Sequence, residues 1–264
     1  MLLERLILIR HGESVGNEAA SAAERAGAEM IDLPYRDADT PLSATGEAQA
    51  DALASALRDL GLDDHARIWS SPYRRAAQTA LRSLALAGTQ AVPVLDERLR
   101  DRELGVLDRL TSVGVDARLP GEAQRRADLG KLYYRPPGGE SWADVALRLR
   151  SFLRDAEGAR ARVAAVYAHE AVVYLLRYAL EGWDERRVLA AAVDEPAPNA
   201  SVTVLERASS GPWQAVRVGD VAHLAEHGVP ATMHRGRTEA RDRSRAGAAR
   251  PSDRSEQDPD ASAE

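Results

Sequence analysis

The sequence predicts an α/β fold, a three-layer sandwich whose mostly parallel central sheet carries helices on both faces. Short apolar runs alternate along the chain with longer segments in which apolar residues recur at helical spacing. Such alternation is typical of parallel strands joined by crossover helices. Hydrophobic residues make up 44% of the 264 residues, enough for a large core, and the chain contains no cysteine. A disulfide scaffold, a thiolate metal site and thiol catalysis are therefore excluded.

The first half of the chain contains three expected strands and two expected helices. Residues 3–9 form a strand, because most of them are large and apolar. Residues 44–60 follow as a helix, since their alanines and leucines recur at helical spacing. A second strand over 66–70 leads into a helix that Pro72 opens, because proline is tolerated in a first turn. Residues 92–95 are expected to form a third, short strand.

The second half continues the alternation. Ser141 is a typical N-cap for a helix whose apolar residues share one face. Residues 163–168 form a strand, followed at once by a helix through Tyr178. Two late strands, over 201–206 and 214–218, are separated by a glycine–proline pair and are expected to form a hairpin.

The overall charge bears on partners and location. The net charge is −6 and the pI is about 5.6, so no global basic field points to nucleic acid. The apolar run at residues 6–9 is far shorter than the roughly 18 residues of a membrane span, or than a signal peptide requires. We therefore expect a cytoplasmic protein that binds neither nucleic acid nor membranes; the sequence predicts no oligomeric state.

Composition changes near the end of the chain. Residues 232–264 contain no valine, isoleucine, leucine, phenylalanine, tryptophan or tyrosine, and arginines there alternate with acidic residues. Such a segment cannot bury enough apolar surface to offset the entropy lost on ordering. We expect one domain over residues 1–225 and a disordered, charged tail over 232–264.

Candidate functional residues follow the expected strands. Arg10, His11 and Gly12 come directly after the first strand, and His169 follows the strand over 163–168. In open α/β sheets, ligands bind beyond the carboxyl ends of the strands, so the two histidines should meet at one edge. Gly12 would let the backbone approach a ligand closely. A three-residue Arg-His-Gly match alone is a weak signal.

A third stretch makes the pattern specific. Residues 71–80 read Ser-Pro-Tyr-Arg-Arg-Ala-Ala-Gln-Thr-Ala and place arginine on the first turn of a helix after a strand. Together these pieces, in this order over residues 3–206, resemble the histidine phosphatase superfamily, also called the phosphoglycerate mutase-like family. The resemblance implies that the domain over 1–225 is of this type. It implies a phosphate pocket made by Arg10, the nucleophile His11, the phosphate ligand Asn17, Arg75 and His169.

The chemistry of these residue types agrees with that family. Arginine offers planar, always-charged donors to a phosphate dianion. A neutral imidazole can attack phosphorus in line, and a second histidine can donate to an equatorial oxygen. The resemblance implies a phosphatase that hydrolyses phosphomonoesters of small metabolites through a phosphohistidine, with no metal or other cofactor. A phosphoglycerate mutase and a weakly catalytic module that binds phosphorylated ligands remain as alternatives.

The family also uses a carboxylic acid to protonate the leaving group, and here the sequence departs from its pattern. The family places a glutamate four residues before a glycine. In this chain Gly105 sets that register and puts Asp101 in the position. We favour Asp101 as the proton donor, with Glu103 and Glu97 as alternatives.

A second departure follows the late strand. The family commonly has glycine after the second histidine, whereas this chain has Glu170. Glu170 would either narrow the site or point outward at the start of a helix, where the helix dipole favours an acid. We favour the outward orientation, because a negative charge facing phosphate would oppose binding.

Substrate contacts are expected from the long connection over 107–137, which has the position of a lid. Tyr134 and Arg135 are the residues that we expect to bind substrate. Arg125 and Arg126 could hold a second anionic group, although a solvated helix face explains them equally well.

Overall fold

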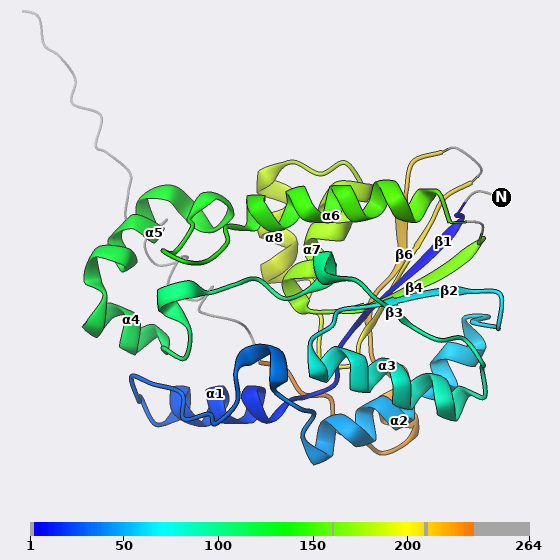
Figure 1. The fold of residues 1–264 in the computed structure, drawn as a ribbon, viewed down its shortest axis with the longest axis horizontal. Helices are drawn as coiled ribbons and strands as arrows, with labels where there is room; N and C mark the ends of the chain where they lie inside the picture. Colours follow the sequence, from blue (N-terminus) through cyan, green and yellow to red (C-terminus); the bar gives the residue numbers. More distant parts are fainter. Residues whose placement is uncertain (1–2, 160, 209–210, 235–264) are drawn as a thin grey trace, which may run out of the picture.

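The computed structural model describes residues 3–159, 161–208 and 211–234. At its centre lies a six-stranded sheet in the order β3-β2-β4-β1-β5-β6 (Figure 1). The strands are β1 (Arg5–Arg10), β2 (Arg67–Ser70), β3 (Val94–Leu95), β4 (Val163–Ala168), β5 (Val202–Glu206) and β6 (Gln214–Asp220). β3, β2, β4 and β1 are parallel, whereas β5 is antiparallel to β1 and pairs with β6 as a hairpin. The prediction of a mostly parallel sheet is confirmed.

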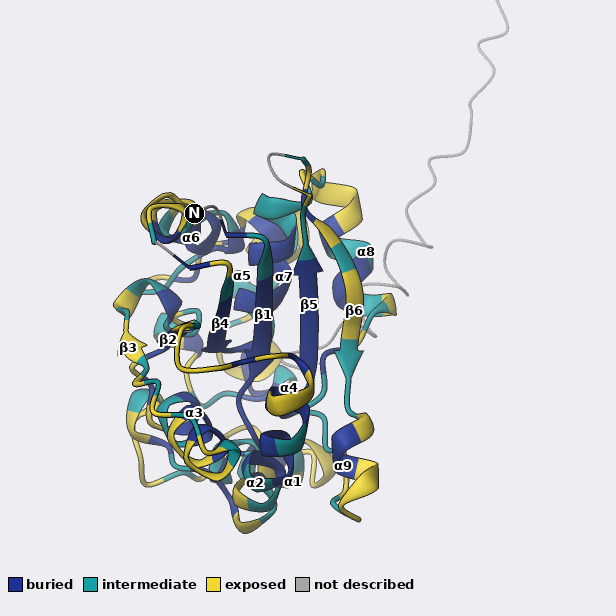
Figure 2. Ribbon diagram, turned by 90° about the vertical axis from the view of Figure 1, so that its right-hand side faces the viewer, coloured by how far each residue is buried: buried dark blue, intermediate teal, exposed yellow. Residues whose placement is uncertain are grey.

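Helices cover both faces of the sheet, as expected for three layers (Figure 1). On one face lie α6 (Trp142–Glu157), α7 (Glu170–Leu180) and α8 (Glu185–Asp194); on the other lie α2 (Ala44–Asp59) and α3 (Arg74–Ala87). A separate apolar cluster fills each interlayer space. Figure 2 shows β1, β4 and β5 almost wholly buried, while β6 forms a more exposed edge. Central strands read as continuous apolar runs because both of their faces are covered.

Three further helices gather beyond the carboxyl ends of the parallel strands: α1 (Val15–Arg25), α4 (Ser112–Arg118) and α5 (Pro120–Tyr133) (Figure 1). α1 begins with a capping box in which Ser14 and Asn17 satisfy each other's backbone amides. This cap places the start of α1 directly after β1. A short α9 (Ala222–Glu226) packs on α2.

Expected boundaries differ from those in the structure by one or two residues at several elements, and two of these differences concern where an element begins. α3 begins at Arg74, with Tyr73 as its N-cap, so Pro72 precedes the helix instead of opening it. β3 contains two residues, because it forms the sheet edge and pairs with β2 alone. In the described part of the chain, no helix is both long and apolar enough to span a membrane.

Candidate active site

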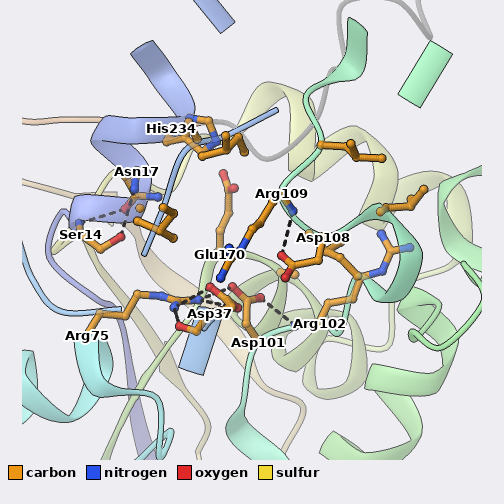
Figure 3. A pocket seen from close by; sticks show the side chains of 18 of the residues that line it. Ser14, Asn17, Asp37, Arg75, Asp101, Arg102, Asp108, Arg109, Glu170 and His234 are labelled. Atoms are coloured by element: carbon orange, nitrogen blue, oxygen red, sulfur yellow. Dashed lines mark hydrogen bonds and ion pairs between the residues drawn. The ribbon is translucent and has the colours of Figure 1, made fainter. Parts of the chain in front are cut away.

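A cavity of about 260 Å³ lies at the carboxyl ends of β1 and β4. Its lining comes from α1, α5 and α7, and from the loops over residues 31–37 and 101–110 (Figure 3). The backbone amide of His11 donates to the carbonyl of Ala168 at 2.9 Å, so the ends of the two strands stay together. The cavity therefore lies at the edge of the sheet where the sequence predicts that His11 and His169 meet.

His11 is buried and held in one tautomer. Its Nδ1 lies 2.7 Å from the carbonyl oxygen of Gly12, which can only accept, so Nδ1 carries the proton. Its Nε2 accepts a hydrogen bond from Nε of Arg75 at 3.3 Å. Burial lowers the pKa of His11 well below its usual value, and the guanidinium of Arg75 lowers it further. The ring is therefore neutral at pH 7, with a lone pair on Nε2.

Arg75, from the first turn of α3, is almost fully buried between two carboxylates. Its Nη1 donates to the backbone oxygen and Oδ1 of Asp37, at 2.7 and 2.9 Å. Its Nη2 donates to Oδ2 of Asp37 at 3.3 Å and to Oδ2 of Asp101 at 3.1 Å. Burial lowers the pKa of Arg75, but the two carboxylates more than offset this effect and the pKa is raised. The guanidinium remains charged.

Arg10 ends β1 and is also buried. Its Nη1 donates to the carbonyl of Ala197 at 2.6 Å, and its Nη2 donates to the carbonyl of His234 at 3.0 Å. Its Nε is buried and has no hydrogen-bond partner among the described residues. A buried donor without an acceptor is costly. An anion in the cavity would satisfy it.

Asn17 contributes an amide to the same side of the cavity. Its Oδ1 accepts from the amide of Ser14 at 3.1 Å and from Nδ2 of Asn199 at 3.3 Å. Because the oxygen is used in this way, the amide nitrogen supplies the donors that can reach the cavity (Figure 3). Asn199 also donates to the carbonyl of His11, and so links the segment before β5 to the end of β1.

His169 lies beside His11, with 5.2 Å between the ring centroids, and is fully buried. Its Nε2 is 2.8 Å from Oγ of Ser71. That oxygen also accepts from the amide of Tyr73, and a hydroxyl can either donate to Nε2 or accept from it, so this contact is compatible with a proton on either ring nitrogen. His169 is not itself part of the cavity lining. Nδ1 is 3.3 Å from Oδ2 of Asp101, without hydrogen-bond geometry. Burial lowers the pKa of His169 well below its usual value, so the ring is neutral.

The three candidate proton donors differ in where they lie relative to the cavity. Asp101 lines the cavity and is held by Arg75 and by the amide of Arg102. Glu103 accepts from the hydroxyl of Tyr73 at 2.7 Å and lies outside the cavity lining. Glu97 is exposed on a 3₁₀ helix and also lies outside it. Of these three carboxyl groups, Asp101 is the one that lines the cavity.

The outward orientation that we expected for Glu170 is wrong. Glu170 lines the cavity, and its Oε1 lies 3.6 Å from Nη1 of Arg10 (Figure 3). Its side chain is 21% exposed. Attraction to a buried guanidinium outweighs solvation at the helix terminus, because charges interact more strongly away from water.

The glycine of the Arg-His-Gly motif has a packing role. A Cβ at Gly12 would lie 2.6 Å from the carbonyl oxygen of Gly46, in the first turn of α2. Gly12 lies outside the cavity lining. The absence of a Cβ at Gly12 therefore makes room for the neighbouring helix, and the close approach of a ligand to its backbone stays a prediction.

Of the two residues of the expected lid that we predicted to bind substrate, one lines the cavity. Tyr134 lines the cavity, and its hydroxyl donates to Glu122 at 2.8 Å. Arg135 does not: its side chain is 63% exposed and pairs with Asp144 at the start of α6. This placement contradicts its assignment as a substrate ligand, because the guanidinium is paired with Asp144 outside the cavity lining. Arg126 lies on the cavity, whereas Arg125 lies outside its lining.

The far wall of the cavity is both cationic and apolar. Burial lowers the pKa of Arg102 to about 10, so this side chain is still charged at neutral pH. Arg109 donates to the carbonyl of Tyr35 at 2.8 Å and joins the loop before α2 to the loop before α4. The apolar part of the wall consists of Ile31, Leu33, Tyr35, Leu104, Leu107 and Leu110.

Residues 232–234, which we expected to belong to the tail, contact the domain. The amide of Asn199 donates to the carbonyl of Thr232 at 2.9 Å, and Arg10 binds the carbonyl of His234. Nδ1 of His234 is 3.2 Å from Oγ of Ser21, and burial lowers the pKa of His234 to about 4. Residues 235–264 of the expected tail lie outside the described residues.

Sequence reasoning missed Asp37, Arg102, Arg109 and His234 as cavity residues. None of them belongs to a motif, and each reaches the cavity through a contact with a distant segment. The positive φ of 56° at Arg109 is visible only in the folded chain. Within the described ranges, no group of three or more His, Asp or Glu side chains is arranged to hold a metal ion.

Comparison with known proteins agrees with this geometry. Residues 6–221 match the family described as the histidine phosphatase superfamily, branch 1. Glucosyl-3-phosphoglycerate phosphatase of Mycolicibacterium vanbaalenii is 37% identical over 149 residues, which cover 56% of this chain and 57% of that protein. A phosphoglycerate mutase-like protein of Arabidopsis thaliana is 33% identical over 165 residues, 58% of this chain and 53% of its own length. The matches thus span about half the length of these relatives.

A solved structure resembles the whole architecture. It is a mycobacterial glucosyl-3-phosphoglycerate phosphatase in complex with inorganic phosphate, with a TM-score of 0.64 and 27% identity. The superposition covers 83% of this chain and 99% of that one. With the match over residues 6–221, these findings show that the chain belongs to the histidine phosphatase superfamily.

Proposed function

We propose that this protein hydrolyses phosphomonoesters of small metabolites through a phosphohistidine formed on His11. The observation that carries the proposal is the state of that ring: it is neutral and buried, with Nδ1 bound to a carbonyl and the lone pair on Nε2 beside a guanidinium. A neutral imidazole with a defined lone pair is what in-line attack on phosphorus requires. The names of the relatives, phosphatases and mutase-like proteins, support the same chemistry.

In the first step, Nε2 of His11 attacks phosphorus while the bond from phosphorus to the ester oxygen breaks. Asp101 gives its proton to the departing alkoxide, so a neutral alcohol leaves. Arg10, through its unpartnered Nε, and Arg75 bind the phosphoryl oxygens. The amide of Asn17 supplies a neutral donor where charge spreads over the equatorial oxygens. With its proton on Nδ1, which has no hydrogen-bond partner among the described residues, His169 supplies a second.

In the second step, the Asp101 carboxylate takes a proton from water as the water oxygen attacks phosphorus. The bond between phosphorus and Nε2 breaks, and inorganic phosphate and neutral His11 are released. The same carboxyl group thus acts as acid and then as base. A mutase would differ only here, because a bound acceptor hydroxyl would replace water.

The experiment is phosphoryl trapping. The purified chain is incubated with a ³²P-labelled aryl phosphate, quenched without acid, and examined for an alkali-stable, acid-labile adduct. We expect the adduct in the wild type and in His65→Ala, whose histidine is exposed and far from the cavity. We expect none in His11→Ala. An adduct that persists in His11→Ala would refute the assignment.

The same preparation distinguishes the alternative functions. Release of inorganic phosphate from aryl phosphate supports the phosphatase. Transfer from 3-phosphoglycerate to a second glycerate position supports the mutase. Binding of phosphate without either product supports the module that only binds ligands. Action without a metal and a cytoplasmic location, both expected from the sequence, stay predictions, as do the charged tail and the absence of nucleic-acid or membrane partners.

A further inference from the structure

The guanidinium of Arg75 has no donor left for a substrate. An arginine side chain carries five N–H groups. The Nε–H of Arg75 is bound to His11, and its Nη1 and Nη2 together make four contacts to Asp37 and Asp101. Attack by Nε2 of His11 releases Nε–H, whereas Nη1 and Nη2 can bind a phosphoryl oxygen only by releasing Asp37 or Asp101.

Asp37 is the partner that is best placed to leave. Its backbone oxygen makes one of the four Nη contacts, and its two carboxylate oxygens make two more, one to each Nη atom. This forked geometry is the one that arginine also offers to phosphate. Asp37 is 48% exposed, whereas Arg75 is 5% exposed, so the carboxylate can return to water while the guanidinium cannot (Figure 3).

The position of Asp37 in the chain supports this exchange. It lies in a three-residue 3₁₀ helix, Asp37–Asp39, between α1 and α2. Asp101, by contrast, is anchored by the amide of Arg102 and has less exposure, 28%. Displacement of Asp37 requires no change in the sheet or in α3.

We propose that Asp37 is an intramolecular competitor of the substrate phosphate at Arg75. This inference rests on the proposed phosphatase function and adds a residue that sets its affinity. In the free enzyme Asp37 keeps the buried guanidinium paired. The phosphate of the substrate replaces the carboxylate, and the carboxylate returns as inorganic phosphate leaves. Asp37 therefore raises the KM for phosphate esters and weakens product inhibition.

The test is the binding of inorganic phosphate to the full chain by isothermal titration, at constant ionic strength. In Asp37→Asn and Asp37→Ala the competing charge is gone, and we expect the Kd for phosphate to fall about tenfold. The KM for an aryl phosphate should fall in the same direction. Asp39→Asn is the matched control, because Asp39 lies in the same 3₁₀ helix but pairs with the exposed Arg36. Its Kd should stay at the wild-type value.

A role for Asp37 in positioning Arg75 predicts the opposite result. In that case both variants would bind phosphate with unchanged or weaker affinity, and kcat would fall while KM stayed constant. Either observation overturns the proposal. If the proposed phosphatase function itself were wrong, the wild-type chain would neither bind phosphate nor release it from an ester. That result differs from both outcomes that concern Asp37.

Discussion

Replacement of Asp101 by asparagine removes proton transfer by this carboxyl group, as acid in the first step and as base in the second, and keeps its hydrogen bonds. The amide has the same shape, and its oxygen can still accept from Nη2 of Arg75 or from the amide of Arg102, as Asp101 does now. What it loses is the proton that the leaving alkoxide needs. General acid catalysis contributes about 10²-fold or more, which corresponds to about 2.7 kcal/mol in the barrier.

The leaving group decides how much of this effect is seen. An alkoxide is a strong base and must be protonated as it departs, so Asp101→Asn should slow an alkyl phosphate by about 10²-fold or more. An activated phenolate leaves without a proton, so the loss for an aryl phosphate should be much smaller. The protonated acid and the amide that replaces it are both neutral and can both contact Arg75, so phosphate binding should change little. The loss is therefore expected in kcat and not in KM.

The assay is the burst of alcohol or phenol in a rapid-quench experiment, because slow hydrolysis of the phosphohistidine would hide a change in the first step. Glu103→Gln is the matched control, since Glu103 binds the Tyr73 hydroxyl and lies outside the cavity lining. Equal losses for the two substrates in Asp101→Asn would refute our assignment. So would a loss confined to the alkyl phosphate in Glu103→Gln.

Three further predictions concern pH, metal and the end of the chain. The fold lowers the pKa values of His11 and His169. Below about pH 6.5 the unfolded chain therefore binds more protons than the folded chain. As the pH falls, each histidine should lower the free energy of unfolding by up to about 1.4 kcal/mol per pH unit. His169→Gln should flatten this slope in urea denaturation between pH 6.5 and 5, and an unchanged slope would contradict it. Activity should survive EDTA; loss that one divalent ion restores would argue against the phosphohistidine route. Removal of residues 235–264 should leave the KM for an aryl phosphate unchanged, whereas removal from Thr232 onward should raise it, because His234 no longer holds Arg10; equal KM values would contradict this role.

The sequence by itself determined the sheet and the place of the site. The periods of apolar residues are local properties, so β1, β4 and the helices around them could be predicted within a few residues. Strand ends carry the motif residues His11 and His169, and parallel strands bring their carboxyl ends to one edge. Arg75 could also be predicted from the sequence, because it belongs to a motif at the start of a helix.

Only the tertiary structure decided how the side chains are paired. Asp37 meets Arg75 across 38 positions of sequence, and His234 meets Arg10 across 224. Glu170 points into the cavity because the buried guanidinium of Arg10 lies beside it. Arg135 points away from the cavity because it pairs with Asp144. Such choices depend on burial and charge contributed by distant segments, whereas local sequence patterns describe only the backbone and the face on which a residue lies.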